Sequence, residues 1–200
     1  IYEGGSNVDS GNIVNPYSAG DRFTITYDGV NIRYYHNGSL ERTVAATITD
    51  ALHADGTGDS VSFNINNVSF MPISSNAVAD APAGVKNDQI SINADGTLAG
   101  AGSGQVTADA LGATNLKLLS SGGKTVTITG NKVAIGGGGT ESSWETQVYS
   151  VDGYDAAQVS FVVDQTGTYA MVGINADPAS SADYHHIDFA WYVENEILQV

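Results

Sequence analysis

The 200-residue sequence contains no cysteine, so it forms neither disulfide bonds nor metal sites built on thiolates. No apolar run approaches the roughly 20 residues that a membrane-spanning helix needs. The first ten residues, IYEGGSNVDS, lack the basic and the apolar parts of a signal peptide. We therefore expect no membrane insertion, and we expect stability to come from packing, backbone hydrogen bonds or assembly.

Basic residues are scarce as well. Seven lysines and arginines stand against 22 aspartates and glutamates, which gives a formal net charge of −15. A chain of that charge repels nucleic-acid phosphates and anionic lipid headgroups on average, so nucleic acid is not an expected partner. Hydrophobic residues make up 42% of the chain, which is enough for one or two domains to bury a core.

Helical periodicity is also nearly absent, because a glycine interrupts the one candidate stripe at 107–119. Apolar and polar residues alternate at 23–27 and 61–65, which indicates strands. After Asn66 and Asn67 the apolar phase shifts by one residue, which predicts a β-bulge. The segments QVSFVVD, TYAMVGI and HIDFAWYV are rich in β-branched and aromatic residues. The predicted fold class is all-β.

The stretch at 27–43, YDGVNIRYYHNGSLERT, contains the dipeptides Asp28-Gly29 and Asn37-Gly38, which reach positive φ easily. Each dipeptide predicts a tight turn, so the stretch is expected to form a three-stranded meander with Asn37 at positive φ. Alternation along the middle strand places Tyr34 in the core and lets Tyr35 reach solvent.

The middle of the chain has a different composition. Residues 74–130 include no aromatic residue and repeat Gly, Ala, Ser, Thr and Asn around the short alternating stretches QISIN and TVTITG. A flexible linker is one interpretation, but the alternation favours short strands in a thin module. The run GGGG at 136–139 marks a break before the next aromatic block.

Several segments resemble parts of one known protein family. YSAGDRFTITYDGVNIRYYHNGSLERT resembles the back half of concanavalin-A-like, lectin-type β-sandwich modules. WETQVYSVDGY, YAMVGINADPASSADYHHIDFAWYV and LQV are similar to the front half of the same module, as found in host-specificity and tail-fibre proteins of tailed bacteriophages. The resemblance implies lectin-like, jelly-roll β-sandwich halves joined by a Gly/Asn-rich β connector.

The two halves occur in reversed order. Residues 131–200 resemble the first half of such a module, 1–72 resemble its second half, and 73–130 are the connector or shaft. Val200 and Ile1 would fill the same position of one strand, which predicts either one period of a tandem array or a permuted domain whose halves meet. The two halves are expected to pack as one sandwich, with the connector outside a core formed by Phe23, Ile25, Ile32, Phe63, Phe70, Val159, Phe161, Met171, Ile174, Phe189 and Trp191.

Aromatic side chains near loop ends are the best candidates for ligand binding. A ring packs against the C–H face of a sugar, while neighbouring acids and amides bind its hydroxyl groups. Packing in the core is the alternative role for each ring. The candidate ligand-binding residues are Trp144, Tyr154, Asp155, Tyr17, Asn15, Tyr184 and Asp183.

Metal binding and catalysis have little support in the sequence. The histidines of DYHHID, residues 183–188, would point to opposite faces of a strand, so a loop-to-strand junction is favoured over a metal site. Asp55 and Asp59 could supply oxygen ligands to Ca²⁺, with a solvated turn as the favoured alternative. The sequence lacks a G-x-S-x-G elbow, a Walker loop and H-E-x-x-H. No catalytic residue and no cofactor apart from Ca²⁺ is expected.

These observations and the resemblance predict a non-enzymatic segment of a viral tail fibre or surface adhesin, located on the virion or outside the cell. Its expected partners are a host-surface carbohydrate or receptor and further copies of itself in an oligomer or tandem array, since several copies multiply weak contacts. A structural spacer with no ligand is the alternative. A polysaccharide depolymerase, with a carboxylate pair brought together by the fold, is the minor alternative.

Overall fold

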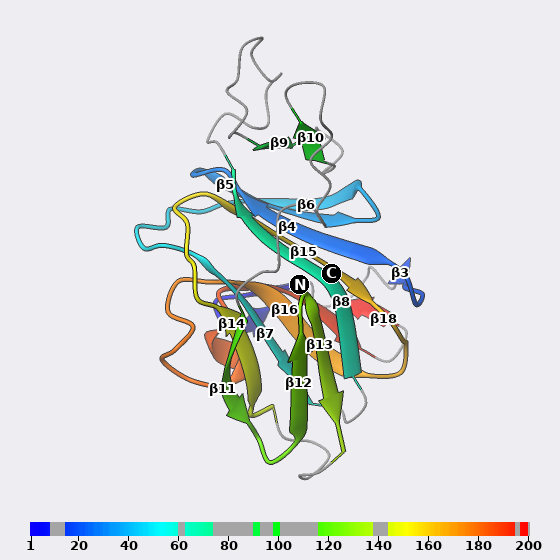
Figure 1. The fold of residues 1–200 in the computed structure, drawn as a ribbon. Helices are drawn as coiled ribbons and strands as arrows, with labels where there is room; N and C mark the ends of the chain where they lie inside the picture. The colour runs from blue at the N-terminus through cyan, green and yellow to red at the C-terminus, as the bar shows by residue number, and fades with distance from the viewer. Residues whose placement is uncertain are drawn as a thin grey trace.

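A computed structural model describes residues 1–8, 15–59, 63–73, 90–92, 98–100, 116–137, 144–194 and 197–199. Two large antiparallel sheets pack face to face around one hydrophobic core (Figure 1). The predicted all-β sandwich is therefore confirmed. Among the described residues, no helix is long and apolar enough to cross a membrane.

The larger sheet, sheet A, contains nine of the described strands. Its main order is β11 (Leu116–Ser121), β14 (Thr146–Ser150), β7 (His53–Gly58), β16 (Tyr169–Asn175), β17 (Phe189–Glu194), β1 (Tyr2–Glu3) and β2 (Ser6–Asn7). β18 (Ile197–Gln199) also pairs with β17 and carries β3 (Asn15–Pro16) at its side. A short 3-10 turn, η2 (Tyr184–His186), precedes β17.

The second sheet, sheet B, contains seven of the described strands. Its order is β12 (Thr125–Thr129), β13 (Lys132–Gly136), β8 (Phe63–Pro72), β15 (Ala157–Val163), β4 (Arg22–Tyr27), β5 (Asn31–His36) and β6 (Ser39–Ala45). β9 (Ile90–Ile92) and β10 (Leu98–Gly100) pair with each other as a separate two-stranded sheet.

Strands from the two ends of the chain are interleaved in both sheets. β15 lies between β8 and β4, and β7 lies between β14 and β16. Trp191 of β17 is fully buried, and its ring centroid lies 5.4 Å from that of Phe23 and 5.6 Å from that of Tyr34 in the opposite sheet. The prediction that residues 1–72 and 144–200 share one core is confirmed for the residues described.

Two short strands follow each other along the same edge of β17. Gln199 of β18 lies opposite Tyr192, and Tyr2 of β1 lies opposite Ala190. One position, opposite Trp191, separates them, and buried Ile1 directly precedes Tyr2. The predicted shared position of Ile1 and Val200 is not tested, because Val200 lies outside the described residues.

The Asn37-Gly38 turn has the predicted geometry. It joins β5 to β6 through two residues, with φ of +50° at Asn37 and +82° at Gly38. The predicted tight turn at Asp28-Gly29 is instead a loop of three residues, 28–30, in which positive φ occurs at Gly29. The Asp28 carboxylate stabilises this loop by accepting hydrogen bonds from the backbone amides of Val30 and Asn31.

The prediction that Tyr35 reaches solvent is wrong, because its side chain is only 2% exposed. Alternation does place it on the outer face of sheet B, opposite Thr24. That face is itself covered around the central strands, where Thr24 and Ser160 are also buried. Alternation assigns a residue to a face, but it does not indicate whether the face is covered.

The predicted β-bulge in β8 is confirmed. Ser69 pairs with Ser160 and Asn66 pairs with Val162, so two residues of β8 face one residue of β15. Asn67 adopts φ of +49° at this point. The extra residue moves the apolar positions of β8 back onto the core side.

The sequence predicted that the connector lies outside the core of the sandwich. This prediction is wrong for its last part, which contributes strands β11 and β12. β11 pairs with β14 in sheet A, and β12 pairs with β13 in sheet B. The ammonium of Lys124, in the turn between them, donates to the carbonyls of Gly58 (3.1 Å) and Asp59 (2.7 Å) at the end of β7. Part of the candidate helix at 107–119 is strand β11, and the remaining connector apart from β9 and β10 lies outside the described residues.

Candidate functional site

The outer face of sheet A carries a second, smaller hydrophobic cluster. Along β16 the residues Ala170 and Val172 face the core, so Met171 between them faces outward. The prediction of Met171 as a residue of the sandwich core was wrong for this reason, since Met171 and Ile174 cannot share a face of one strand. Met171 is nevertheless fully buried, together with Ile187 and Ala190.

Four partly buried aromatic residues pack over these three apolar residues. We call them the aromatic ring cluster: Tyr2 of β1, Trp144 just before β14, Tyr184 of η2 and Tyr192 of β17. Ring centroids are 6.0 Å apart for Tyr2 and Tyr184, 4.9 Å for Tyr184 and Trp144, 5.6 Å for Trp144 and Tyr192, and 5.5 Å for Tyr192 and Tyr2. The four rings therefore form a closed circuit, in which each contacts two others.

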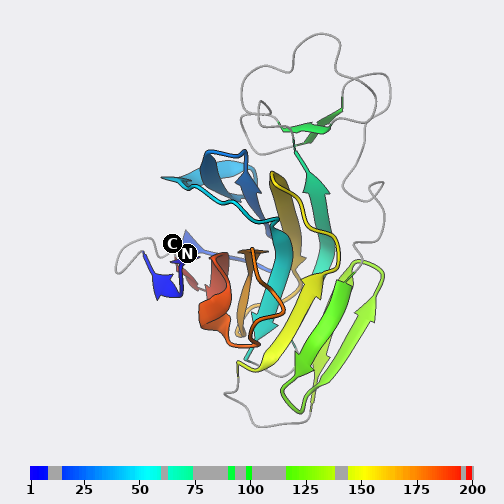
Figure 2. The ribbon, with the colours of Figure 1, turned by 90° about the vertical axis from the view of Figure 1, so that its left-hand side faces the viewer.

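The 3-10 turn and the β1–β2 hairpin position this circuit. Asp183 caps η2 by accepting a hydrogen bond from the backbone amide of His185 (3.0 Å) and contacts its Nδ1 (2.8 Å). Gly5, at φ of +75°, lies against the same turn, where a Cβ would stand 2.7 Å from the carbonyl oxygen of His185. Figure 2 shows the hairpin beside the turn. Only glycine allows the hairpin to approach so closely.

The cluster lies in an acidic environment. Burial raises the pKa of Tyr192 far above its usual value, and the negative charges of Glu194 and Asp59 and the neighbouring tyrosines add to this effect. Burial also raises the pKa of Tyr2, and the electrostatic influence of Tyr184 and Glu194 adds to this effect. Glu194 follows Tyr192 by two residues on β17 and so lies on the same face of the sheet.

Beside the cluster, on the same face of sheet A, lies a buried polar group centred on Asp55 of β7. Its Oδ2 accepts hydrogen bonds from the side-chain amides of Gln147 (2.6 Å) and Asn175 (2.7 Å). Burial raises the pKa of Asp55 to about 7, although these two amides and the amide of Gly56 favour the charged form. Asp55 Oδ1 and Gln147 Oε1 are buried without a hydrogen-bond partner among the described residues.

The expectation that Asp55 and Asp59 lie in a loop able to bind Ca²⁺ is not met for Asp55. Asp55 lies on β7, a central strand of sheet A, and is 2% exposed. Its partner Gln147 also donates a hydrogen bond to the carbonyl of Pro178. Within the described part of the chain, no three His, Asp or Glu side chains come together as a group that could hold a metal ion.

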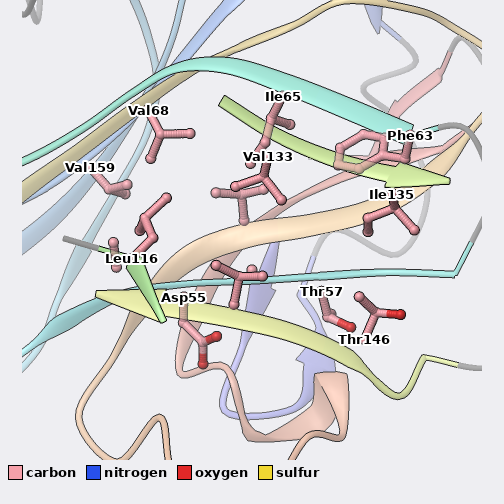
Figure 3. Close-up of a pocket in the computed structure, with 14 residues that line it drawn as sticks. Asp55, Thr57, Phe63, Ile65, Val68, Leu116, Val133, Ile135, Thr146 and Val159 are labelled. Atoms are coloured by element: carbon pink, nitrogen blue, oxygen red, sulfur yellow. The ribbon is translucent and has the colours of Figure 1, made fainter. Parts of the chain in front are cut away.

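The inward positions of β7 are occupied by Ala54, Gly56 and Gly58, which fill little space. A cavity of about 30 Å³ remains next to them between the sheets. Apolar side chains of both sheets line it, and the carboxylate of Asp55 points away from them (Figure 3). A cavity of this size could hold about two water molecules, but an apolar lining offers them no hydrogen bonds. The cavity is therefore a packing feature of the core.

The fold brings together three of the sequence-predicted site residues: Trp144, Tyr184 and Asp183. The other candidates lie elsewhere. Tyr17 is 3% exposed and packs on Phe23 inside the core, so its ring is closed to ligands. The remaining three are Tyr154, which packs on Phe70, the neighbouring exposed Asp155, and Asn15, which pairs with Leu198.

Sequence reasoning missed Tyr2, Tyr192 and Glu194. The segment FAWYV did contain a signal for Tyr192, because strand alternation places it on the face opposite Trp191. No local signal predicted that Tyr2 would lie beside Tyr192, since this contact depends on the pairing of β1 with β17.

Comparisons with known proteins add no family assignment. No protein-family model matches the chain, and a search of curated proteins finds none that matches it.

Proposed function

We propose that this chain is a glycan-recognition segment of a viral tail fibre or surface adhesin, and that the aromatic ring cluster binds the sugar. The observation that carries the proposal is the closed circuit of four half-buried rings on the outer face of sheet A, bordered by the carboxylates of Glu194 and Asp183. The resemblance of the sequence to lectin-type modules of phage fibres supports the same conclusion.

The chemistry of the cluster suits a sugar. Ring faces pack against the C–H face of a pyranose, and carboxylates accept hydrogen bonds from its hydroxyl groups. The rings come from separate segments of the chain and rest on a fully buried floor, so their positions are largely fixed before a ligand arrives. Such a preformed site loses little conformational entropy on binding.

A glycan array probed with the soluble chain tests the proposal. We expect reproducible binding that Tyr184→Ala abolishes, because this change opens the circuit without touching the core between the sheets. Tyr154→Ala is the matched control, since it removes an equally half-buried tyrosine that packs on Phe70 away from the cluster. Melting curves of both variants report on folding.

The alternative functions give different results. An array with no signal from a folded chain would overturn the proposal and favour a structural spacer. Release of reducing ends from host polysaccharide would instead indicate a depolymerase.

A further inference from the structure

We propose that the aromatic ring cluster selects glycans that carry ammonium groups, as amino sugars with free or methylated amines do, over neutral and anionic glycans. This inference rests on the proposed function and names the ligand class of the same site. Two features of the outer face of sheet A carry it: the arrangement of the rings and the charges around them.

The rings are arranged as a cation site requires. A cation is attracted to an aromatic face when it lies within about 6 Å of the ring centroid. Successive centroids in the circuit are 4.9 to 6.0 Å apart, so a single ammonium group seated on the circuit would be close to several rings at once. The planes of contacting rings in the circuit meet at 44° to 85°. The imidazole of His185 also lies against Tyr184, with the two centroids 3.8 Å apart.

The charges around the rings are negative. Glu194 contributes to the raised pKa of both Tyr2 and Tyr192, and Asp59 contributes to that of Tyr192, so their fields reach the cluster. Asp183 adds a further carboxylate next to Tyr184. The net charge of −15 attracts cations over longer distances. An anionic sugar would have to approach against all of these charges.

Two basic groups near the cluster have partners within the chain. The ammonium of Lys124 donates to two carbonyls at the end of β7, and the imidazole of His185 contacts Asp183. The same face of sheet A already contains a cation over a ring, since Lys117 Nζ lies 5.8 Å from the centroid of Tyr149.

Calorimetric titration of the folded chain with three sugar tetramers tests the inference. The probes are the N-trimethylated glucosamine tetramer, whose charge does not depend on pH, the neutral N-acetylglucosamine tetramer and the anionic galacturonic acid tetramer. At low ionic strength we expect the trimethylated tetramer to bind about tenfold more tightly than the neutral one, and the anionic one not to bind. High salt should reduce the tenfold ratio, because salt screens exposed charges.

A charge-removing variant sharpens the test. Glu194→Gln should lower the affinity for the trimethylated tetramer more than the affinity for the neutral one, so their ratio falls about threefold or more. The control is Asp50→Asn, an exposed carboxylate between β6 and β7, which should leave the ratio unchanged. If Glu194→Gln does not fold, the salt dependence of the unmodified chain still decides the question.

The outcomes separate the two proposals. Neutral tetramer binding as tightly as the trimethylated one, or galacturonate binding more tightly, would overturn the selectivity while leaving glycan recognition intact. Failure of all three sugars to bind would overturn the selectivity, and only a silent glycan array as well would overturn both proposals. A lysine tetrapeptide that binds as tightly as the trimethylated sugar would show that the cluster recognises cationic protein segments, and this would overturn the sugar assignment.

Discussion

The outer faces of the two sheets differ although both sheets share one core. On sheet B several central outer residues are polar, and some of them bond one another: Ser160 Oγ lies 3.1 Å from Thr24 Oγ1 and accepts a hydrogen bond from Arg22 (3.2 Å). On sheet A the outer face carries four half-buried rings and several carboxylates. Both faces contain buried residues but differ in their side-chain chemistry, which is why burial alone does not identify a functional surface.

The largest expected effect comes from the core that both faces depend on. Trp191→Ala should lower the free energy of unfolding by about 3–5 kcal/mol, because Trp191 contacts Phe23 and Tyr34 across the sandwich and donates from Nε1 to the carbonyl of Thr24 (3.2 Å). Denaturant titration measures the loss. Tyr184→Ala, on the outer face, should cost much less, and equal losses would contradict the division between core and surface.

The second prediction concerns the buried acid on the outer face of sheet A. Folding raises the pKa of Asp55 to about 7, whereas an unfolded aspartate has a pKa near 3.9. The folded chain therefore retains a proton that the unfolded chain has lost, and stability falls as the pH rises from about 4 through about 7. The decrease should be on the order of 2 kcal/mol or more.

Asp55→Asn tests this prediction, because it keeps the shape of the side chain but cannot ionise. Thermal melts at pH 4.5 and pH 8, two conditions either side of the expected change, should show a smaller loss of stability in the variant than in the unmodified chain. The raised pKa of Asp188 acts in the same direction and is present in both proteins. An identical pH dependence in both would exclude Asp55 as its source.

The third prediction concerns the hairpin of sheet B. Asn37→Val should destabilise the chain by about 1 kcal/mol or more, because a β-branched side chain resists the positive φ observed at this position. It also removes the hydrogen bonds that the Asn37 side chain makes with Asp21 and with the backbone of Arg22. Asn37→Gly keeps the backbone geometry accessible and separates the two contributions. Unchanged melting of Asn37→Val would contradict the strained turn.

The smallest expected effect concerns the space next to β7. Gly56→Ala should change the free energy of unfolding by no more than about 0.5 kcal/mol, because the gain from replacing a strand glycine is opposed by a Cβ that stands 3.3 Å from the backbone carbonyl oxygen of Met171. Gly58→Ala is the matched contrast, since its Cβ would stand 2.8 Å from Ile135 Cδ1. Denaturant titration should give Gly56→Ala a higher free energy of unfolding than Gly58→Ala. The reverse order would show that the cavity next to β7 does not accommodate a methyl group at Gly56.

Local chemistry explains which parts of the fold were predictable from the sequence. The turn at Asn37-Gly38 and the bulge at Asn67 follow from backbone preferences, and alternation identified most of the strands. At Met171 the prediction was wrong because Met171 lies an odd number of residues from Ile174 and so faces the other side of the strand. At Tyr35 alternation gave the correct face but not its burial. The strand character of His53–Gly58 was missed because a strand of Ala, Asp, Gly and Thr has little β propensity, and its neighbours hold it in the sheet.

The candidate site was only partly predictable. Trp144, Tyr184 and Asp183 stood out as an aromatic or acid near a loop, whereas Tyr2 joins the site through the pairing of β1 with the distant strand β17, which also carries Glu194. Tyr17 satisfied the same local criterion as Tyr184 and proved to be a core residue. Local sequence identifies which side chains suit a ligand, but the long-range pairings decide which of them meet.

The interleaving of strands from both ends of the chain has a consequence for how the protein forms during synthesis. β4 pairs with β15 and β7 pairs with β16, contacts that span more than half of the chain and are slow to form. The first 72 residues leave the ribosome well before these partner strands exist, so Phe23, Ile25 and Phe63 stay exposed in the meantime. Translation speed and chaperone supply should therefore control the yield of folded protein more strongly than its equilibrium stability does.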